Sequence, residues 1–338
     1  MYSTTNMKSL TMFWVSMLMF ISSLCMIHSH PERDLIAKLK LQNAFGPKDT
    51  AFDPRGGGPY TGVRDGRILK FSNGNFVDFA ITSPFRTKEK CDGTNGTNLL
   101  SICGRPLGLD FNRRTGDLYI ADIHFGLLRV GSNGGLAKQL AAGINGKNFI
   151  FADSVSLDQL TGDAYFVESG EIFLTNDFAR IAQSGDTSGR LLKYEAATGQ
   201  VTEVLTGLAG PVGNAISEDH TFIFITLFIG RKIIKHYIRG PKAKTTETVL
   251  ENLGGNPEFV KRATSLSGGF WVPVNTPREQ QPSPMTDSIA VKFDRNGKIL
   301  ETRNLTKDYP KLLGSYFEYF GKAYTGSLEA DFVGVYRA

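Results

Sequence analysis

A single carboxylate stands among aromatic residues near the end of the chain, in the segment GSYFEYFG at residues 314–321. If this segment is a strand, its side chains alternate between two faces, so Tyr316, Glu318 and Phe320 share one face. The two rings would partly desolvate the Glu318 carboxylate and raise its pKa. A glutamate with a raised pKa is suited to act as a general base near neutral pH. The alternative is a solvated glutamate at a strand end among packed aromatic residues.

The familiar catalytic motifs are absent from the sequence. It contains no Gly-x-Ser-x-Gly, no phosphate-binding loop, no dinucleotide-binding glycine motif and no His-Glu-x-x-His. His124 follows an expected strand, His220 falls in an expected turn and His236 within another strand. A histidine alone is more often a surface or core residue than a catalytic one, because a site is defined by its geometry. Glu318 is therefore the main catalytic candidate from the residues alone.

The cysteines indicate an oxidising compartment. Of three cysteines, Cys25 lies in the apolar N-terminal segment, which leaves Cys91 and Cys103 as an even pair. We expect these two to form one disulfide, which would stabilise the fold by about 3 kcal/mol in the chain-entropy model. Asn95, inside this loop, begins Asn-Gly-Thr, and Asn304 begins Asn-Leu-Thr. Both asparagines are candidates for N-glycosylation in a secreted chain.

The N-terminus has the pattern of a secretory signal. An early lysine precedes an apolar run at residues 10–27, and small and polar residues follow up to Ser29. We expect residues 1–29 to be a signal peptide and residues 30–338 to be a single domain in the secretory pathway. The run is nearly long enough to span a bilayer, so a retained signal anchor is the alternative. No later segment is apolar for long enough, so no membrane span is expected after cleavage.

The composition is that of a folded globular chain. Among 338 residues, 41% are hydrophobic and 21% charged, which excludes disorder, collagen and coiled coil. The formal charge is +5, but lysine and arginine are scattered instead of forming a stripe. We therefore expect no nucleic-acid partner. The 37 glycines and 24 phenylalanines favour turns and strands, and so an all-β fold.

Internal repeats indicate the architecture. A strand, a Thr-Gly-Asp turn and a second strand occur at residues 109–122 and again at residues 157–168. The pattern Gly-Arg-x-Leu-Lys-aromatic occurs at residues 66–71 and at residues 189–194. A period of roughly 40–50 residues with several strands is typical of a β-propeller. We expect six blades, each a four-stranded antiparallel sheet around a central channel, and a short helix at residues 33–44.

Further short motifs occur in a characteristic order along the chain. They are Phe52-Asp53-Pro54, Asp65-Gly66-Arg67-Ile68-Leu69-Lys70, Cys103-Gly104-Arg105-Pro106-Leu107-Gly108, Gly131-Ser132-Asn133-Gly134-Gly135, Thr187-Ser188-Gly189-Arg190-Leu191-Leu192-Lys193-Tyr194 and Val291-Lys292-Phe293-Asp294. In these motifs the chain resembles the strictosidine synthase-like family of plants, from about Phe52 to the C-terminus. The resemblance implies a six-bladed propeller, a signal peptide, the disulfide between Cys91 and Cys103, and a vacuolar destination, with the extracellular space as the alternative.

The resemblance also implies an activity. Strictosidine synthase, a carbon–nitrogen lyase of alkaloid biosynthesis, joins tryptamine to the aldehyde secologanin in a Pictet–Spengler condensation. Its essential glutamate follows a phenylalanine late in the chain, as Glu318 follows Phe317 here. Glu318 would then handle the proton of the substrate amine and remove the ring proton after cyclisation. The implied partner is a small molecule, and no cofactor is implied.

Several positions match the substrate pocket of that enzyme, and others depart from it. Phe228 and Leu328 match residues of the pocket wall. Tyr316 stands where the family has a histidine, and Phe151 and Asp153 stand where it has a tryptophan and a tyrosine. We therefore expect a substrate pocket of altered shape, lined by Phe151, Phe228, Tyr316 and Leu328.

Two further functions remain open. The propeller is shared with calcium-dependent lactonases and esterases such as paraoxonase, whose metal ligands are carboxylate and amide oxygens. The corresponding residues here are Asp153, Asn214 and Glu258, but Lys48 replaces the first acid and Phe259 an asparagine. A calcium-assisted hydrolase is therefore the second hypothesis, and a non-catalytic propeller that binds a partner or metabolite is the third. The sequence leaves the substrates and the oligomeric state open.

Overall fold

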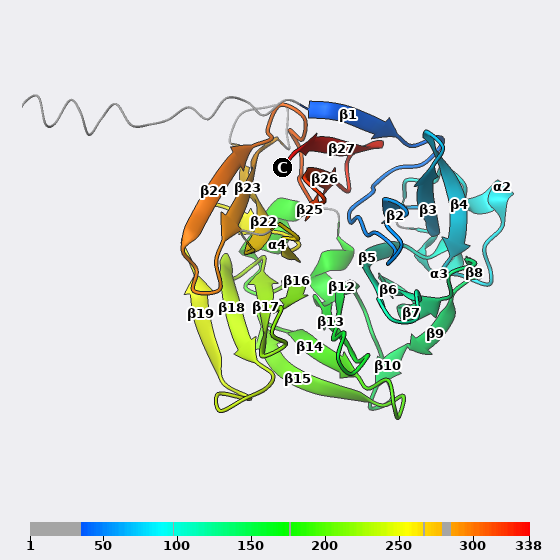
Figure 1. The fold of residues 1–338 in the computed structure, drawn as a ribbon. Coiled ribbons are helices and arrows are strands. Elements are labelled where there is room, and N and C mark those ends of the chain that lie inside the picture. Colours follow the sequence, from blue (N-terminus) through cyan, green and yellow to red (C-terminus); the bar gives the residue numbers. More distant parts are fainter. Residues whose placement is uncertain (1–34, 97, 176, 266–267, 279–284) are drawn as a thin grey trace, which may run out of the picture. The chain divides into compact units, whose positions relative to one another are not determined.

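Six four-stranded sheets surround a common centre like the blades of a propeller (Figure 1). This architecture confirms the all-β, six-bladed prediction. The computed structural model describes residues 35–96, 98–175, 177–265, 268–278 and 285–338, which belong to one unit at Asp34–Ala338. The expected signal peptide, residues 1–29, lies outside the described residues. Within them, no helix is long and apolar enough to cross a membrane.

Each blade runs from an inner strand at the centre to an outer strand at the rim. The first blade consists of β2 (Tyr60–Gly62), β3 (Arg67–Ser72), β4 (Asn75–Ile81) and β8 (Gly135–Leu136). The second consists of β5 (Pro106–Phe111), β6 (Leu118–Asp122), β7 (Gly126–Val130) and β9 (Lys138–Ala141). The third consists of β12 (Ala152–Leu157), β13 (Ala164–Glu168), β14 (Gly189–Tyr194) and β15 (Val201–Leu208).

The fourth blade consists of β16 (Pro211–Ile216), β17 (Phe222–Leu227), β18 (Lys232–Tyr237) and β19 (Thr246–Leu250). The fifth consists of β20 (Asn256–Pro257) with β21 (Lys261–Arg262), β22 (Phe270–Pro277), β23 (Thr286–Phe293) and β24 (Ile299–Asn304). The sixth consists of β25 (Ser315–Tyr319), β26 (Lys322–Gly326), β27 (Phe332–Arg337) and β1 (Leu35–Lys40).

Two blades depart from the regular pattern. The outer strand β8 of the first blade pairs in parallel with β4, and it comes from the segment that leads into β9 of the second blade. The residues that follow β4 directly are used for the disulfide loop described below, so a later segment covers this blade edge. In the fifth blade, the inner strand is interrupted between β20 and β21.

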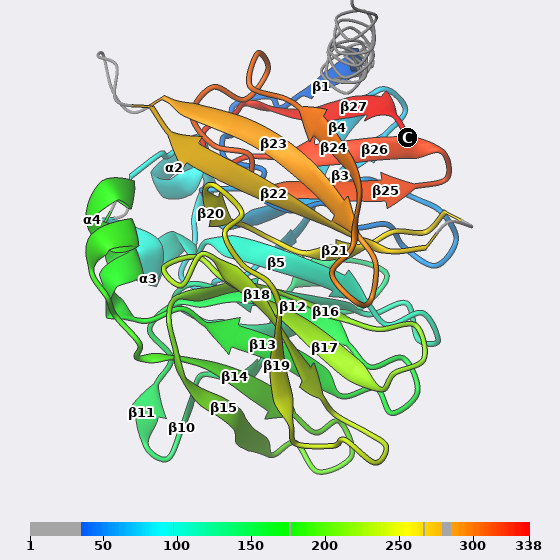
Figure 2. The same ribbon diagram turned by 90° about the vertical axis from the view of Figure 1, so that its left-hand side faces the viewer.

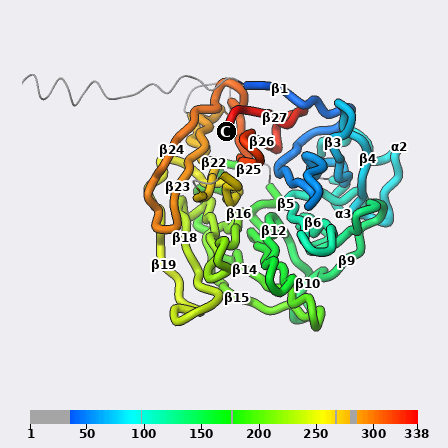
Figure 3. The backbone as a smooth tube through the Cα atoms, viewed as in Figure 1, coloured from blue at the N-terminus to red at the C-terminus, as the bar shows by residue number. Residues whose placement is uncertain are grey.

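The last blade joins the two ends of the described chain. The first strand, β1, pairs antiparallel with β27, and the chain trace shows them side by side (Figure 3). The prediction of a helix at residues 33–44 is therefore wrong. Intermediate and exposed residues alternate along β1, and this period of two is that of a strand with one face against the sheet.

Side chains between neighbouring blades make up the core. The inner strands β12 and β16 are buried at every residue because blades surround them on both faces. Between the fourth and fifth blades, Phe224 packs against Phe270 with ring centroids 4.7 Å apart and against Phe293 at 5.2 Å. An apolar strand such as β17 therefore packs against the neighbouring blade on each of its two faces.

The helices are short and lie together on one face of the propeller. They are α2 (Lys88–Cys91), α3 (Leu100–Cys103), the 3-10 helix η1 (Glu171–Leu174) and α4 (Phe178–Gln183). Figure 2 shows α2, α3 and α4 on the same side. A small hairpin, β10 (Gly143–Ile144) with β11 (Lys147–Asn148), completes the described elements. The helices mark the face on which the candidate site lies.

Candidate functional site

A cavity of about 410 Å³ lies at the end of the inner strands that faces the helices. Its lining includes residues of α3, η1 and α4 (Leu100, Phe173 and Phe178). The pocket-wall candidates Phe151, Phe228 and Leu328 all line it. We call this space the helix-side cavity. Its apolar wall can hold an aromatic or aliphatic ligand, as small-molecule sites commonly do.

Three charged side chains meet in the lining of this cavity. The Lys48 ammonium lies 2.7 Å from a carboxylate oxygen of Asp153 and 3.5 Å from one of Glu258. All three side chains are at most 4% exposed. Lys48 also lies over the ring of Phe259, 4.2 Å from its centroid. We call Lys48, Asp153 and Glu258 the Lys48 cluster.

Glu258 is the member of the cluster that is suited to proton transfer. Its pKa is raised to about 7, mainly by burial and also by the Asp153 charge, whereas the Lys48 ammonium acts in the opposite direction. Its Oε2 atom is buried and forms no hydrogen bond with any described residue. Asp153 is held more tightly, because it accepts hydrogen bonds from Lys48 at 2.7 Å and from Ser169 at 3.3 Å. Near neutral pH, Glu258 can therefore both donate and accept a proton inside the cavity.

The predicted calcium ligands do not come together as a set. Asp153 and Glu258 meet, but the Asn214 side chain accepts a hydrogen bond from Ser154 at 3.0 Å and donates one to the Tyr165 carbonyl at 2.9 Å. Between the two carboxylates lies the Lys48 ammonium, a cation supplied by the chain itself. No group of three or more metal-ligating side chains of His, Cys, Asp or Glu occurs among the described residues. This donor set does not fit a divalent cation.

Added calcium is therefore expected to leave the melting temperature unchanged. The Lys48 ammonium already lies between the two carboxylates that a calcium ion would need, and a second cation beside it would be repelled. Thermal unfolding with calcium and with a chelator measures this directly. A calcium-dependent rise of the melting temperature that is lost in Asp153→Asn would contradict our interpretation.

Glu318 and Tyr316 lie elsewhere, in the interface between the fifth and sixth blades. Glu318 Oε2 accepts hydrogen bonds from the Trp271 indole at 2.8 Å and from the Lys292 ammonium at 3.1 Å. The Tyr316 ring packs on Trp271, with centroids 4.4 Å apart, and its hydroxyl pairs with Arg303. Among the described residues, neither of the two lines the helix-side cavity.

The position of Glu318 along its strand explains this separation. Directly before β25, Gly314 packs against Lys48, and a Cβ added there would lie 3.0 Å from the Lys48 side chain. Glu318 is four residues further on, roughly 13 Å along an extended strand. Its neighbours Phe317 and Tyr319 line a second cavity of about 500 Å³ at the other end of the inner strands, which we call the far cavity.

The expected raised pKa of Glu318 is wrong. Burial does act to raise this pKa, but hydrogen bonds from Ser265, Trp271 and Lys292 outweigh it, so that the pKa is lowered. The expectation failed because Trp271 and Lys292 are remote in sequence and reach Glu318 only in the folded chain. Phe320 also does not share the strand face, because β25 ends at Tyr319 and Phe320 is 83% exposed in the following turn.

Glu318→Gln is expected to lower the free energy of unfolding by about 1–3 kcal/mol at neutral pH, since it weakens charge-assisted hydrogen bonds. A carboxylate whose pKa is lower in the folded state stabilises the fold above its unfolded pKa and loses that effect as pH falls through its folded pKa. The difference between the two proteins should therefore shrink in acid, as measured by urea unfolding across pH. Glu218→Gln, at an 88% exposed side chain, is the control and should change little. An equal difference at all pH values would contradict this.

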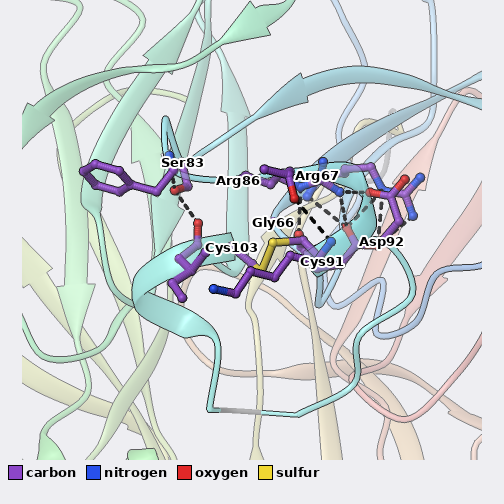
Figure 4. Close-up of a disulfide and its surroundings, with 12 residues drawn as sticks. Gly66, Arg67, Ser83, Arg86, Cys91, Asp92 and Cys103 are labelled. Carbon is purple, nitrogen blue, oxygen red and sulfur yellow. Dashed lines mark hydrogen bonds and ion pairs between the residues drawn. A yellow bond between two sulfur atoms is a disulfide. The ribbon is translucent and has the colours of Figure 1, made fainter.

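The predicted disulfide between Cys91 and Cys103 is confirmed (Figure 4). The two cysteines end α2 and α3. Gly66 is required beside them, because its φ is +88° and a Cβ there would lie 1.7 Å from the Cys103 carbonyl oxygen. Ion pairs hold the same loop: Arg67 with Asp92 at 3.7 Å, and Arg86 with Asp92. The loop thereby brings Leu100 to the cavity wall.

Replacing Cys91 and Cys103 together by serine is expected to lower the free energy of unfolding by about 3 kcal/mol, because the unfolded chain gains freedom. Urea unfolding measures the loss, and wild-type protein under reducing conditions should behave like the double variant. Equal stability of oxidised and reduced wild type would contradict the expectation.

The two predicted glycosylation sites are accessible. Asn95 and Asn304 are both exposed, the first in the disulfide loop and the second at the end of β24. Their glycosylation stays a prediction. The main chain and side chain of Asn95 accept hydrogen bonds from Arg64, which lines the helix-side cavity. A glycan on Asn95 would therefore stand beside this cavity.

Arg105 is a charged residue of the cavity that the sequence did not predict. Arg105, directly before β5, lines the helix-side cavity and is only 5% exposed. The sequence feature that could have indicated it is the position of this arginine, between the disulfide-bonded Cys103 and the first residue of a strand, Pro106. Nothing in the local sequence shows that this arginine is buried.

Comparison with known proteins agrees with this fold. A family model described as strictosidine synthase matches residues 153–241. Strictosidine synthase-like protein 11 of Arabidopsis thaliana is 37% identical over 297 residues, which cover 87% of this chain and 89% of the relative. Strictosidine synthase of Catharanthus roseus is 33% identical over 300 residues, which cover 86% of this chain and 83% of the relative.

Two solved structures show the same architecture. A gluconolactonase from Xanthomonas campestris has a TM-score of 0.62 at 12% identity and covers 92% of both chains. Regucalcin, a calcium-binding protein from Agrobacterium tumefaciens, has a TM-score of 0.58 at 11% identity and covers 89% of this chain and 93% of its own. At such identities the likeness supports the propeller fold alone.

Proposed function

Because this chain belongs to the strictosidine synthase family, we propose that it is an enzyme that condenses an amine with an aldehyde in the helix-side cavity. In this proposal, Glu258 is the acid and base, and Phe151, Phe228 and Leu328 form the wall that holds the reactants. Tryptamine and secologanin are the first substrates to try, since they are the substrates that the resemblance implied.

One observation carries the proposal. The Glu258 carboxyl is buried in the cavity lining, its Oε2 forms no hydrogen bond with any described residue, and its pKa is raised to about 7. A carboxyl in this state exchanges protons readily at neutral pH, which a condensation with loss of water requires.

The steps balance with Glu258 alone as the proton carrier. The amine adds to the aldehyde carbon and gives a carbinolamine. The Glu258 carboxylic acid donates its proton to the carbinolamine hydroxyl. The carbon–oxygen bond then breaks, water departs, and an iminium ion remains. A ring carbon of the amine attacks the iminium carbon, and the Glu258 carboxylate then removes the proton from that ring carbon, which restores the acid.

The charge of the Lys48 cluster suits these steps. Lys48 and Asp153 neutralise each other at 2.7 Å, so ionised Glu258 gives the Lys48 cluster one net negative charge. This negative charge is present while the iminium cation exists, and it disappears when Glu258 takes up the proton of the ring carbon. Fixed charges of this kind stabilise transition states without reorganisation.

The catalytic role that the resemblance implied for Glu318 stays a prediction, and it would require a reaction site outside the helix-side cavity. Glu318 is engaged by Trp271 and Lys292, and a molecule held by Phe151, Phe228 and Leu328 lies at the other end of the inner strands. The matching of Glu318 rests on two adjacent residues, whereas the assignment of Glu258 rests on its place in the cavity. The same assay can test both.

The test is a search for product. Protein made through the secretory pathway, so that Cys91 and Cys103 can pair, is incubated with tryptamine and secologanin and then with a panel of amines and aldehydes. Mass spectrometry should find a product whose mass equals the two reactants less one water, formed by wild type and greatly reduced in Glu258→Gln. If no pair gives product above a heat-denatured blank, the proposal fails and a non-catalytic binding propeller is favoured.

A further inference from the structure

Among the described residues, the side chain of Arg105 in the lining of the helix-side cavity has no hydrogen-bond or ion-pair partner. Arg105 is 5% exposed, and its main-chain N–H donates to Asp122 at 2.7 Å. Its side chain forms no hydrogen bond or ion pair with any described residue, and its Nε atom is buried and unsatisfied. Leaving a buried guanidinium without a partner is costly, so such a group in a cavity points to a ligand that completes it.

Arg105 remains a cation in spite of its burial. Its pKa is lowered to about 10, mainly by burial and also by the charge of Arg64, while Glu329, Asp153 and Asp122 act in the opposite direction. The guanidinium is therefore protonated at neutral pH. Its five N–H groups form a planar fork that matches the two oxygens of a carboxylate.

The neighbouring charges do not satisfy Arg105. Arg64, also in the lining, is paired with Glu329 and bonds Asn95, so this acid already has its own partner. The Nε atom of Arg64 is buried and unsatisfied as well. The one carboxylate on this part of the wall, Glu329, thus pairs with Arg64 and not with Arg105.

The whole lining carries an excess of positive charge. It holds five cationic side chains, Lys48, Arg64, Arg105, Arg278 and Lys311, and three acidic ones, Asp153, Glu258 and Glu329. Such a lining disfavours a reactant whose only charge is an ammonium group. It accepts an amine more readily when that molecule or its reaction partner brings an anion.

We infer that Arg105 binds a carboxylate of the substrate, so that one of the two reactants is a small carboxylic acid with an aromatic or aliphatic body. The carboxylate would lie against the Arg105 guanidinium while the body packs against apolar residues such as Phe151 and Phe228. This inference rests on the proposed function only in placing the substrate in the helix-side cavity. Arg105 is then a specificity-determining residue.

The test uses two probes of nearly the same shape, phenylacetate and phenylacetamide, and measures binding by calorimetry at neutral pH. Wild type is expected to bind phenylacetate about tenfold or more tightly than phenylacetamide, as one charged hydrogen-bonded contact would give. The preference should disappear in Arg105→Gln and be largely retained in Arg105→Lys. It should persist in Arg278→Gln, because Arg278 already has Asp287 as its partner.

Binding does not depend on turnover, so the two proposals can fail separately. A preference for phenylacetate in a protein that forms no condensation product would leave the Arg105 inference standing and overturn the proposed reaction. Equal affinity for both probes, no binding of phenylacetate, or an unchanged preference in folded Arg105→Gln would overturn the Arg105 inference. Circular dichroism and the melting temperature establish that each variant is folded.

Discussion

Glu258→Gln is expected to lower kcat/KM for the condensation by about 10²–10⁴-fold, because the amide can neither donate nor accept the proton that the steps require. The substitution keeps the shape of the side chain and removes only its acid–base function. Initial rates with the amine and aldehyde identified by the product search measure the effect.

The pH profile separates this role from simple packing. In wild type, kcat/KM should fall as pH rises through about 7, the raised pKa of Glu258, because the carboxylic acid that expels water is then lost. In Glu258→Gln the residual rate should lack this limb. A variant that keeps the wild-type rate, or the same limb with a lower rate, would contradict the assignment.

Lys48→Met is expected to lower the free energy of unfolding by about 3–5 kcal/mol at neutral or alkaline pH. It leaves Asp153 and Glu258, both buried, without their counter-charge, and a broken buried pair costs this much. The loss should shrink in acid, since protonation of the two carboxyls removes the unbalanced charge. Urea unfolding at several pH values measures it.

A double variant tests the origin of that loss. Adding Glu258→Gln to Lys48→Met removes one unbalanced carboxylate and should recover part of the stability, so the two substitutions are not additive. Lys193→Met is the matched control, since Lys193 pairs with Asp163 at 2.8 Å but is 26% exposed; it should cost less than about 1 kcal/mol. Equal costs of the two lysine substitutions would contradict the account of the Lys48 cluster.

The fold could be predicted from the sequence because its signals are local. The Thr-Gly-Asp turns recur at the same point of two blades, where residues 109–122 and 157–168 join an inner strand to the next. The pair of cysteines could be assigned because only two remained. The prediction of a helix at residues 33–44 failed because β1 pairs with β27, a partner almost three hundred residues away that no local pattern reveals.

The site was predictable only in part. Phe151, Phe228 and Leu328 could be placed in one pocket because the resemblance supplied their positions. Lys48 was expected beside the carboxylates, and the structure places it between Asp153 and Glu258. The positions of Asn214 and Glu318 could not be predicted in this way. Each inner strand runs from one cavity to the other, so a shift of two residues along it changes the cavity or the neighbours that a side chain contacts.

The most direct test of the account is the rate of Glu258→Gln against that of Glu318→Gln, measured side by side in one condensation assay at a temperature where both are folded. If the chemistry takes place in the helix-side cavity, Glu318→Gln should retain most of the wild-type rate while Glu258→Gln loses it. A Glu318→Gln protein that is folded but inactive, beside an active Glu258→Gln, would contradict the account and return the reaction to Glu318.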